Sequence, residues 1–131
     1  MLIRKLLISS MVLLAFAAGA AVVSGQDGWR KLGEKDVNHN VDHDTITASN
    51  KGKIKEIRFS VRNAPIKFRK VVINYKDGTK QELEFLEDVK LDQDTRSITI
   101  QGDGHVISSV DIWYETDSLG GKKAKITAYG R

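Results

Sequence analysis

The sequence predicts an all-β fold, an antiparallel β-sandwich or jelly roll of about eight short strands. Apolar and polar residues alternate with a period close to two along much of the chain after Gln26. Residues that favour turns recur between these alternating runs, and no stretch of useful length has the periodicity of an amphipathic helix. Short strands separated by regular turns are typical of a sandwich built from two sheets.

The first 25 residues have the three-part build of a secretory signal peptide. Arg4 and Lys5 form a short basic start, residues 6–18 are almost free of polar groups, and small residues follow. Cleavage is possible after Ala20 or after Gly25, and we favour Gly25 because a polar residue follows it. The prediction is a signal peptide at 1–25 and one β-sandwich domain at 26–131.

The alternative for this segment is a retained membrane anchor. Residues 6–23 are close to the shortest length that can span a membrane, because a span needs roughly 17–25 residues. Two serines, a glycine and many alanines weaken the apolar run further. We therefore expect an exported protein, periplasmic or extracellular, with no stable transmembrane segment after cleavage.

Composition excludes several classes of function. Removing 25 of the 131 residues leaves 106, enough for one domain with its own core. The chain has no cysteine, which excludes disulfides, thiol chemistry and a zinc site with cysteine ligands. Two of the 21 basic residues lie in the signal segment, so 19 basic and 17 acidic residues leave a net charge of +2. This near-neutral balance gives no case for a nucleic-acid partner.

Each alternating run predicts a strand with one buried face. We expect the sole proline, Pro65, to lie in a connection, because proline disrupts a strand interior. Ile54 and Val72 are out of phase with their neighbours, which indicates either a bulge or, for Val72, cover on the second face. The residues predicted to be buried are Phe59, Val71, Leu83, Phe85, Ile98, Ile100, Val110 and Ile112.

One hairpin can be predicted in register. A two-residue loop at Asp77 and Gly78 would place the apolar faces of the two strands out of step. A three-residue loop of Lys76, Asp77 and Gly78 brings the faces together, pairing Ile73 with Gln81. We therefore predict a type I turn followed by Gly78 in the left-handed region, which makes Gly78 a structural residue.

The triplet Asp42-His43-Asp44 is a candidate metal or acid/base cluster. In an extended segment Asp42 and Asp44 share one face while His43 points to the other, so a metal needs further ligands from another loop. The alternative is that these residues serve as turns and strand ends. The loop residues that might complete such a site, and with it a small metal-dependent hydrolase, are Asp92, Asp94, Asp103 and His105. No motif indicates a cofactor, because the pair Gly102 and Gly104 lacks the third glycine of a dinucleotide site.

Five basic residues cluster around the connection at 63–65. If the flanking strands are neighbours, these residues form a basic strip for anionic lipid or polysaccharide. The alternative is that they keep an edge strand from pairing with another molecule. The five are Arg58, Arg62, Lys67, Arg69 and Lys70.

Trp113 falls on the face opposite Val110, Ile112 and Tyr114, beside Asp111 and Glu115. An exposed tryptophan flanked by carboxylates is suited to stacking on a sugar ring. In the alternative, Ile107 and Trp113 pack under a loop or against the second sheet, and Tyr114 lies nearer water. We favour this alternative because large aromatic residues are mostly buried.

Several stretches of the chain carry a resemblance to a known family. They are the signal segment, Leu32-Gly33 after Trp29, and residues 54–61, 71–75, 95–100, 106–114 and 124–130. Together they resemble the YaaI-like family of small exported bacterial proteins, a domain of unknown function. The resemblance lies in the strand pattern of most of the mature chain, with a few matching residues, and it implies a β-rich periplasmic domain without naming any site residue. We therefore expect an exported, non-catalytic protein that binds a ligand or has a structural role in the envelope, with a carbohydrate-binding module using Trp113 or a small hydrolase as alternatives.

Overall fold

The computed structural model describes residues 28–37, 42–50, 52–116 and 123–131. The chain divides into two compact units, residues 1–30 and 31–131, and the account below concerns the second. The predicted signal peptide and both cleavage sites lie outside the described residues. Within the described part of the chain, no helix is long and apolar enough to cross a membrane.

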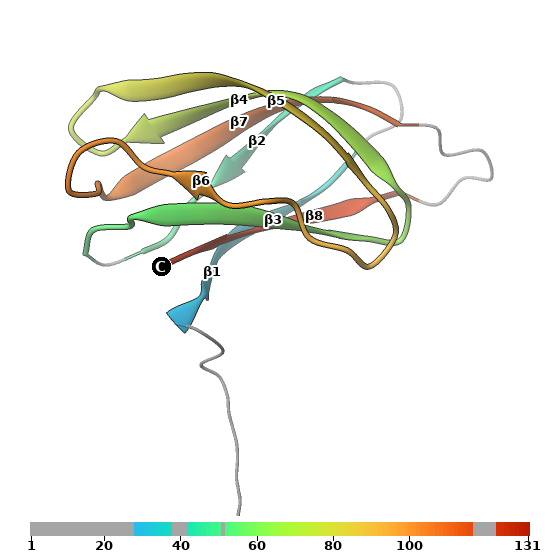
Figure 1. The fold of residues 1–131 in the computed structure, drawn as a ribbon, viewed down its shortest axis with the longest axis horizontal. Coiled ribbons are helices and arrows are strands. Elements are labelled where there is room, and N and C mark those ends of the chain that lie inside the picture. The colour runs from blue at the N-terminus through green and yellow to red at the C-terminus, as the bar shows by residue number, and fades with distance from the viewer. Residues whose placement is uncertain (1–27, 38–41, 51, 117–122) are drawn as a thin grey trace, which may run out of the picture. The chain divides into compact units, whose positions relative to one another are not determined.

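The fold is a sandwich of two four-stranded antiparallel sheets, as Figure 1 shows, which confirms the predicted class. One sheet has the order β1-β8-β3-β6, and the other has the order β2-β7-β4-β5. The strands are β1 (Arg30–Asp36), β2 (His43–Thr47), β3 (Glu56–Arg62), β4 (Ile66–Tyr75), β5 (Lys80–Val89), β6 (Ile98–Thr99), β7 (Ile107–Glu115) and β8 (Lys125–Gly130).

The inward faces of the two sheets enclose one apolar core. Three phenylalanines meet between the sheets: Phe59 from β3, Phe68 from β4 and Phe85 from β5, with ring centroids 5.5, 5.8 and 6.2 Å apart. Every residue predicted to be buried is buried, except that Leu83 is only partly covered. Burying each large apolar side chain contributes about 1.5–3 kcal/mol, so this alternation is the main source of stability.

The hairpin between β4 and β5 has the predicted register. Ile73 pairs with Gln81, and the amide of Tyr75 donates to the carbonyl of Thr79. Gly78 has φ +94°, in the left-handed region that disfavours residues with a Cβ. This turn, and the position of Pro65 between β3 and β4, are therefore confirmed.

The two out-of-phase residues have different explanations. Relative to β7, β4 has one extra residue, Arg69, between the pairs made by Phe68 and Lys70, and this is a bulge. Val72 then lies on the outward face of the sheet and is only 5% exposed. It is therefore covered on that face, which was one of the predicted alternatives. Ile54 precedes β3 and forms an isolated bridge with His105, which explains its different phase from the strand.

Candidate functional site

The outward face of the β2-β7-β4-β5 sheet gathers the polar and aromatic residues that carry chemistry. Because the side-chain period of a strand is two, alternate pairs in the register place their side chains on this one face. The rows across the sheet are His43, Trp113, Lys70 and Glu84, then Thr45, Asp111, Val72 and Glu82, then Thr47, Ser109, Asn74 and Lys80.

Trp113 stands in the first row between two partners. The His43 ring stacks on the indole, with centroids 4.2 Å apart and planes 14° from parallel. Lys70 Nζ lies 4.6 Å from the centroid of the indole, close enough for a cation–π contact. Since β7 lies between β2 and β4, the two partners reach the half-buried indole from strands on opposite sides of β7.

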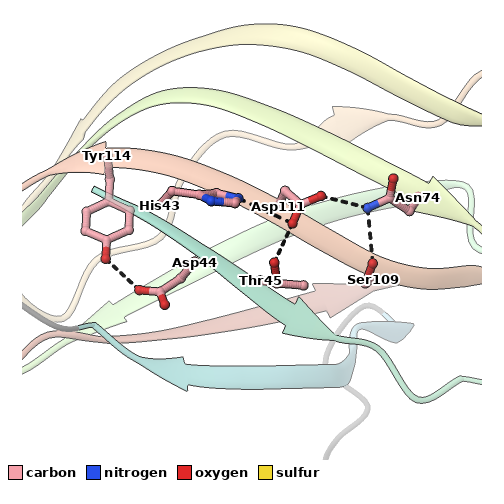
Figure 2. A network of polar contacts seen from close by, with 7 residues as sticks. All are labelled: His43, Asp44, Thr45, Asn74, Ser109, Asp111 and Tyr114. Carbon is pink, nitrogen blue, oxygen red and sulfur yellow. Dashed lines mark hydrogen bonds and ion pairs between the residues drawn. The ribbon is translucent and has the colours of Figure 1, made fainter. Parts of the chain in front are cut away.

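Asp111 is the centre of a polar network beside this stack, shown in Figure 2. Thr45 Oγ1 donates to Oδ1 of Asp111 at 2.5 Å, and Asn74 Nδ2 donates to Oδ2 at 2.9 Å. His43 Nε2 lies 3.4 Å from Oδ1 of Asp111, and the two groups form an ion pair when the imidazole is protonated. Partial burial raises the pKa of Asp111, but the hydrogen bonds from Thr45 and Asn74, together with the nearby His43, outweigh it and hold the pKa below its usual value.

A hollow of about 350 Å³ opens next to Trp113, and we call it the tryptophan hollow. It offers both donors and acceptors, since Arg69 forms an ion pair with Glu115 at its edge. Tyr114 donates its hydroxyl to Asp44 Oδ2 at 2.5 Å, and burial together with Asp44 raises the pKa of Tyr114. The hollow is lined by Asp42, Arg69, Lys70, Trp113, Tyr114 and Glu115.

The arrangement corrects the favoured sequence interpretation of Trp113. Tyr114 is 1% exposed and belongs to the core, so it is not the residue nearer water. Trp113 does not pack against the second sheet; it lies half-buried on the outward face with Asp111. The large ring is covered by His43 and Lys70 from adjacent strands, a lateral contact that alternation alone does not show.

The premise of one basic strip is wrong. β3 and β4 belong to different sheets, because the connection at 63–65 carries the chain from one sheet to the other. The outward residues Arg58 and Arg62 therefore lie on one sheet, and Lys67, Arg69 and Lys70 lie on the other. Four of the five face carboxylates: Arg58 with Asp94 and Arg62 with Asp92, each at 3.9 Å, Arg69 with Glu115, and Lys70 with Glu82 at 2.9 Å.

The acidic residues considered for a metal site take different partners. Asp44 accepts the hydroxyl of Tyr114, and Asp42 lines the tryptophan hollow. Asp92 and Asp94 face the arginines of β3, while His105 Nδ1 lies 3.7 Å from Asp77. Among the described residues, no group of three or more histidine, aspartate or glutamate side chains is placed to hold a metal ion.

Sequence reasoning missed the parts of the site that depend on strand pairing. His43, Lys70 and Asn74 join Trp113 and Asp111 only because β2 and β4 flank β7. The signal available was the alternation itself, which places His43 and Trp113 on outward faces but does not say that their strands are neighbours.

Fold and site together define a small β-sandwich domain with an aromatic and polar surface site. The family model described as a domain of unknown function, DUF2541, matches residues 6–130, and the chain belongs to this family. The narrower resemblance to the YaaI-like family stays a prediction. A comparison with curated proteins finds no match.

One similar solved structure is AlgX of Pseudomonas aeruginosa, from a structural and functional characterization of that protein. The TM-score is 0.50 and the sequence identity is 10%, over 88% of this chain and 34% of AlgX. The chain therefore spans about a third of AlgX, and the likeness concerns the fold alone.

Proposed function

We propose that this protein is a non-catalytic binding module of the bacterial cell envelope that holds polysaccharide at the tryptophan hollow. The observation that carries the proposal is Trp113, a large aromatic ring on an outward sheet face beside a hollow of about 350 Å³. Aromatic faces bind the apolar side of sugar rings, and nearby charged and hydroxyl groups bind the sugar hydroxyls. Arg69, Asp42 and Glu115 supply such groups.

The geometry of the stack says where a sugar would lie. His43 does not line the hollow, whereas Lys70 does, so the sugar approaches the indole from the β4 side. Lys70 is then the residue to be displaced. Its ion pair with Glu82 lies at the surface, where such pairs contribute little to stability, and its cation–π contact with the half-buried ring is also weak. A sugar ring replaces these contacts at small cost, while the stack of His43 from β2 continues to hold the indole.

The proposal is tested by tryptophan fluorescence with purified envelope polysaccharide of the host as the probe. A Trp29→Phe background removes the second tryptophan signal. We expect saturable quenching or a spectral shift, absent after Trp113→Ala and retained after Leu86→Ala. Leu86 is a suitable control because it is an apolar side chain that is 65% exposed on β5, outside the hollow.

Two outcomes would contradict polysaccharide binding. One is the absence of any response in the parent protein. The other is a response to phosphatidylglycerol vesicles but not to polysaccharide, which would assign the surface to anionic lipid instead. Lys70→Ala sharpens the test, because removing the displaced side chain should leave affinity equal or increased.

The proposed location has its own experiment. The basic start, apolar run and small residues of the first 25 positions support export to the periplasm or beyond. The narrower YaaI-like assignment, which we also propose, agrees with export. Mass spectrometry of the envelope fraction should find a mature chain that starts at or near Gln26. An intact chain retaining residues 1–25 in the cytoplasm would refute it.

A further inference from the structure

A second hollow, of about 330 Å³, lies at the opposite end of the same sheet from the tryptophan hollow. It forms where β4 ends at Tyr75 and where the chain enters β7 at Ile107. We call it the histidine hollow. Its lining residues are Lys53, Lys76, Asp77, Gly104, His105 and Val106.

The charges that line the histidine hollow are mainly positive. Lys53 and Lys76 form no ion pair within the part of the chain that the structure describes. The acidic group among the lining residues, Asp77, is engaged by the turn and by His105. Its Oδ1 accepts from Thr79 Oγ1 at 2.6 Å and from the Thr79 amide at 2.9 Å, and its Oδ2 lies 3.7 Å from His105 Nδ1. These bonds hold the pKa of Asp77 below its usual value. Two lysines against one carboxylate leave one excess positive charge among the lining residues.

His105 is held in a fixed orientation at this hollow. Its ring stacks on Tyr75, with centroids 3.9 Å apart and planes 10° from parallel. Tyr75 is itself anchored in the core, and its hydroxyl donates to Gln81. An imidazole supported in this way presents its edge to a ligand without first losing conformational freedom.

Gly104 allows the backbone to take its path beside His105. Its φ is +93°, and a Cβ placed there would lie 2.8 Å from the carbonyl oxygen of Ile54 and 3.1 Å from Cγ of Lys55. Only glycine fits this conformation without a shift of the neighbouring backbone.

We propose that the histidine hollow binds a phosphate group carried by a ligand. Lysine ammonium groups bind phosphate as compact point charges. A phosphate group carries a charge of about −1.5 to −2 at pH 7, more than a single carboxylate, so a hollow lined by two lysines favours phosphate over carboxylate. This site is separate from the tryptophan hollow and does not depend on the function proposed for it.

The test is an amide and imidazole NMR titration with inorganic phosphate at pH 7, with chloride used to keep the ionic strength constant. We expect saturable shifts centred on Gly104 and His105. Lys53→Gln and Lys76→Gln should each weaken binding about two- to fivefold, the range of an exposed charge pair. Lys35→Gln is the matched control, an exposed lysine on β1 without an ion pair among the described residues, and it should leave the affinity unchanged.

Three results would overturn the proposal. They are shifts that grow without saturation, equal binding of acetate, and affinity unaffected by both lysine substitutions. The glutamine variants lie at exposed positions, so their melting curves should match the parent. His105→Gln provides a further readout, because it removes the imidazole while keeping a polar side chain and should also weaken phosphate binding.

Discussion

Two histidine–aromatic stacks at opposite ends of one sheet show how strand alternation decides whether an aromatic ring lies in the core or on the outward face. His43 on Trp113 and His105 on Tyr75 have similar geometry, and each imidazole lies near a carboxylate. Yet Tyr75 is 4% exposed and part of the core, whereas Trp113 is on the outward face. A histidine–aromatic stack is therefore anchored in the core at Tyr75, whereas it lies on the surface of the sheet at Trp113.

The largest difference between the stacks should appear in stability. Tyr75→Ala removes a buried aromatic ring, so we expect the free energy of unfolding to fall by about 3–5 kcal/mol. Tyr75→Phe keeps the ring and removes only the hydroxyl that donates to Gln81, which should cost about 1 kcal/mol. Urea denaturation measures both variants. A loss below about 1 kcal/mol for Tyr75→Ala would show that the ring does not support the core.

The surface stack should be less important for stability. Trp113→Ala loses a ring contact worth about 0.5–1.5 kcal/mol and a cation–π contact worth about 0.5–1 kcal/mol. We therefore expect a cost of about 1–2.5 kcal/mol, below that of Tyr75→Ala. Urea denaturation of the two variants under identical conditions makes the comparison. Equal losses would mean that Trp113 is a core residue, and would remove the main support for a polysaccharide site.

The features predicted from the sequence are those fixed by neighbouring residues. Alternation predicted the buried faces of β3, β4, β5 and β7, because a half-buried strand repeats every two residues. The β4–β5 hairpin could be predicted in register because turn length and the two apolar faces constrain one another. The same period predicted that Trp113 lies on the face opposite to that of Ile112. It did not predict that His43 and Lys70 cover the indole.

The features that could not be predicted depend on which strands become neighbours. β1 and β2 bury few apolar side chains, chiefly Leu32 and Ile46, so their alternation is too weak to identify them. Nothing local shows that β3 and β4 enter different sheets, and this crossing divided the expected basic strip. The network around Asp111 required the same knowledge, since Thr45 and Asn74 reach it from different strands.

The smallest expected effect concerns the carboxylates that accompany the two stacks. In the folded protein the pKa values of Asp111 and Asp77 are both lowered, by the hydrogen bonds described above. A carboxyl group with a lowered folded-state pKa stabilises the protein above its unfolded value, about 3.9, and this contribution is lost as the pH falls through the folded-state value.

Asp111→Asn should therefore be less stable than the parent at pH 7, and the difference should shrink as the pH falls below about 4. Asp77→Asn should follow the same trend with a smaller amplitude, because Asp77 is fully exposed and asparagine can still accept from the Thr79 amide. Unfolding free energies from pH 2 to 7, measured by denaturant titration, compare the two variants. A difference for Asp111→Asn that stays constant with pH would show that its carboxylate contributes through packing and not through charge. A larger pH dependence for Asp77→Asn than for Asp111→Asn would show that the Asp77 carboxylate contributes more to stability than the Asp111 carboxylate, contrary to this prediction.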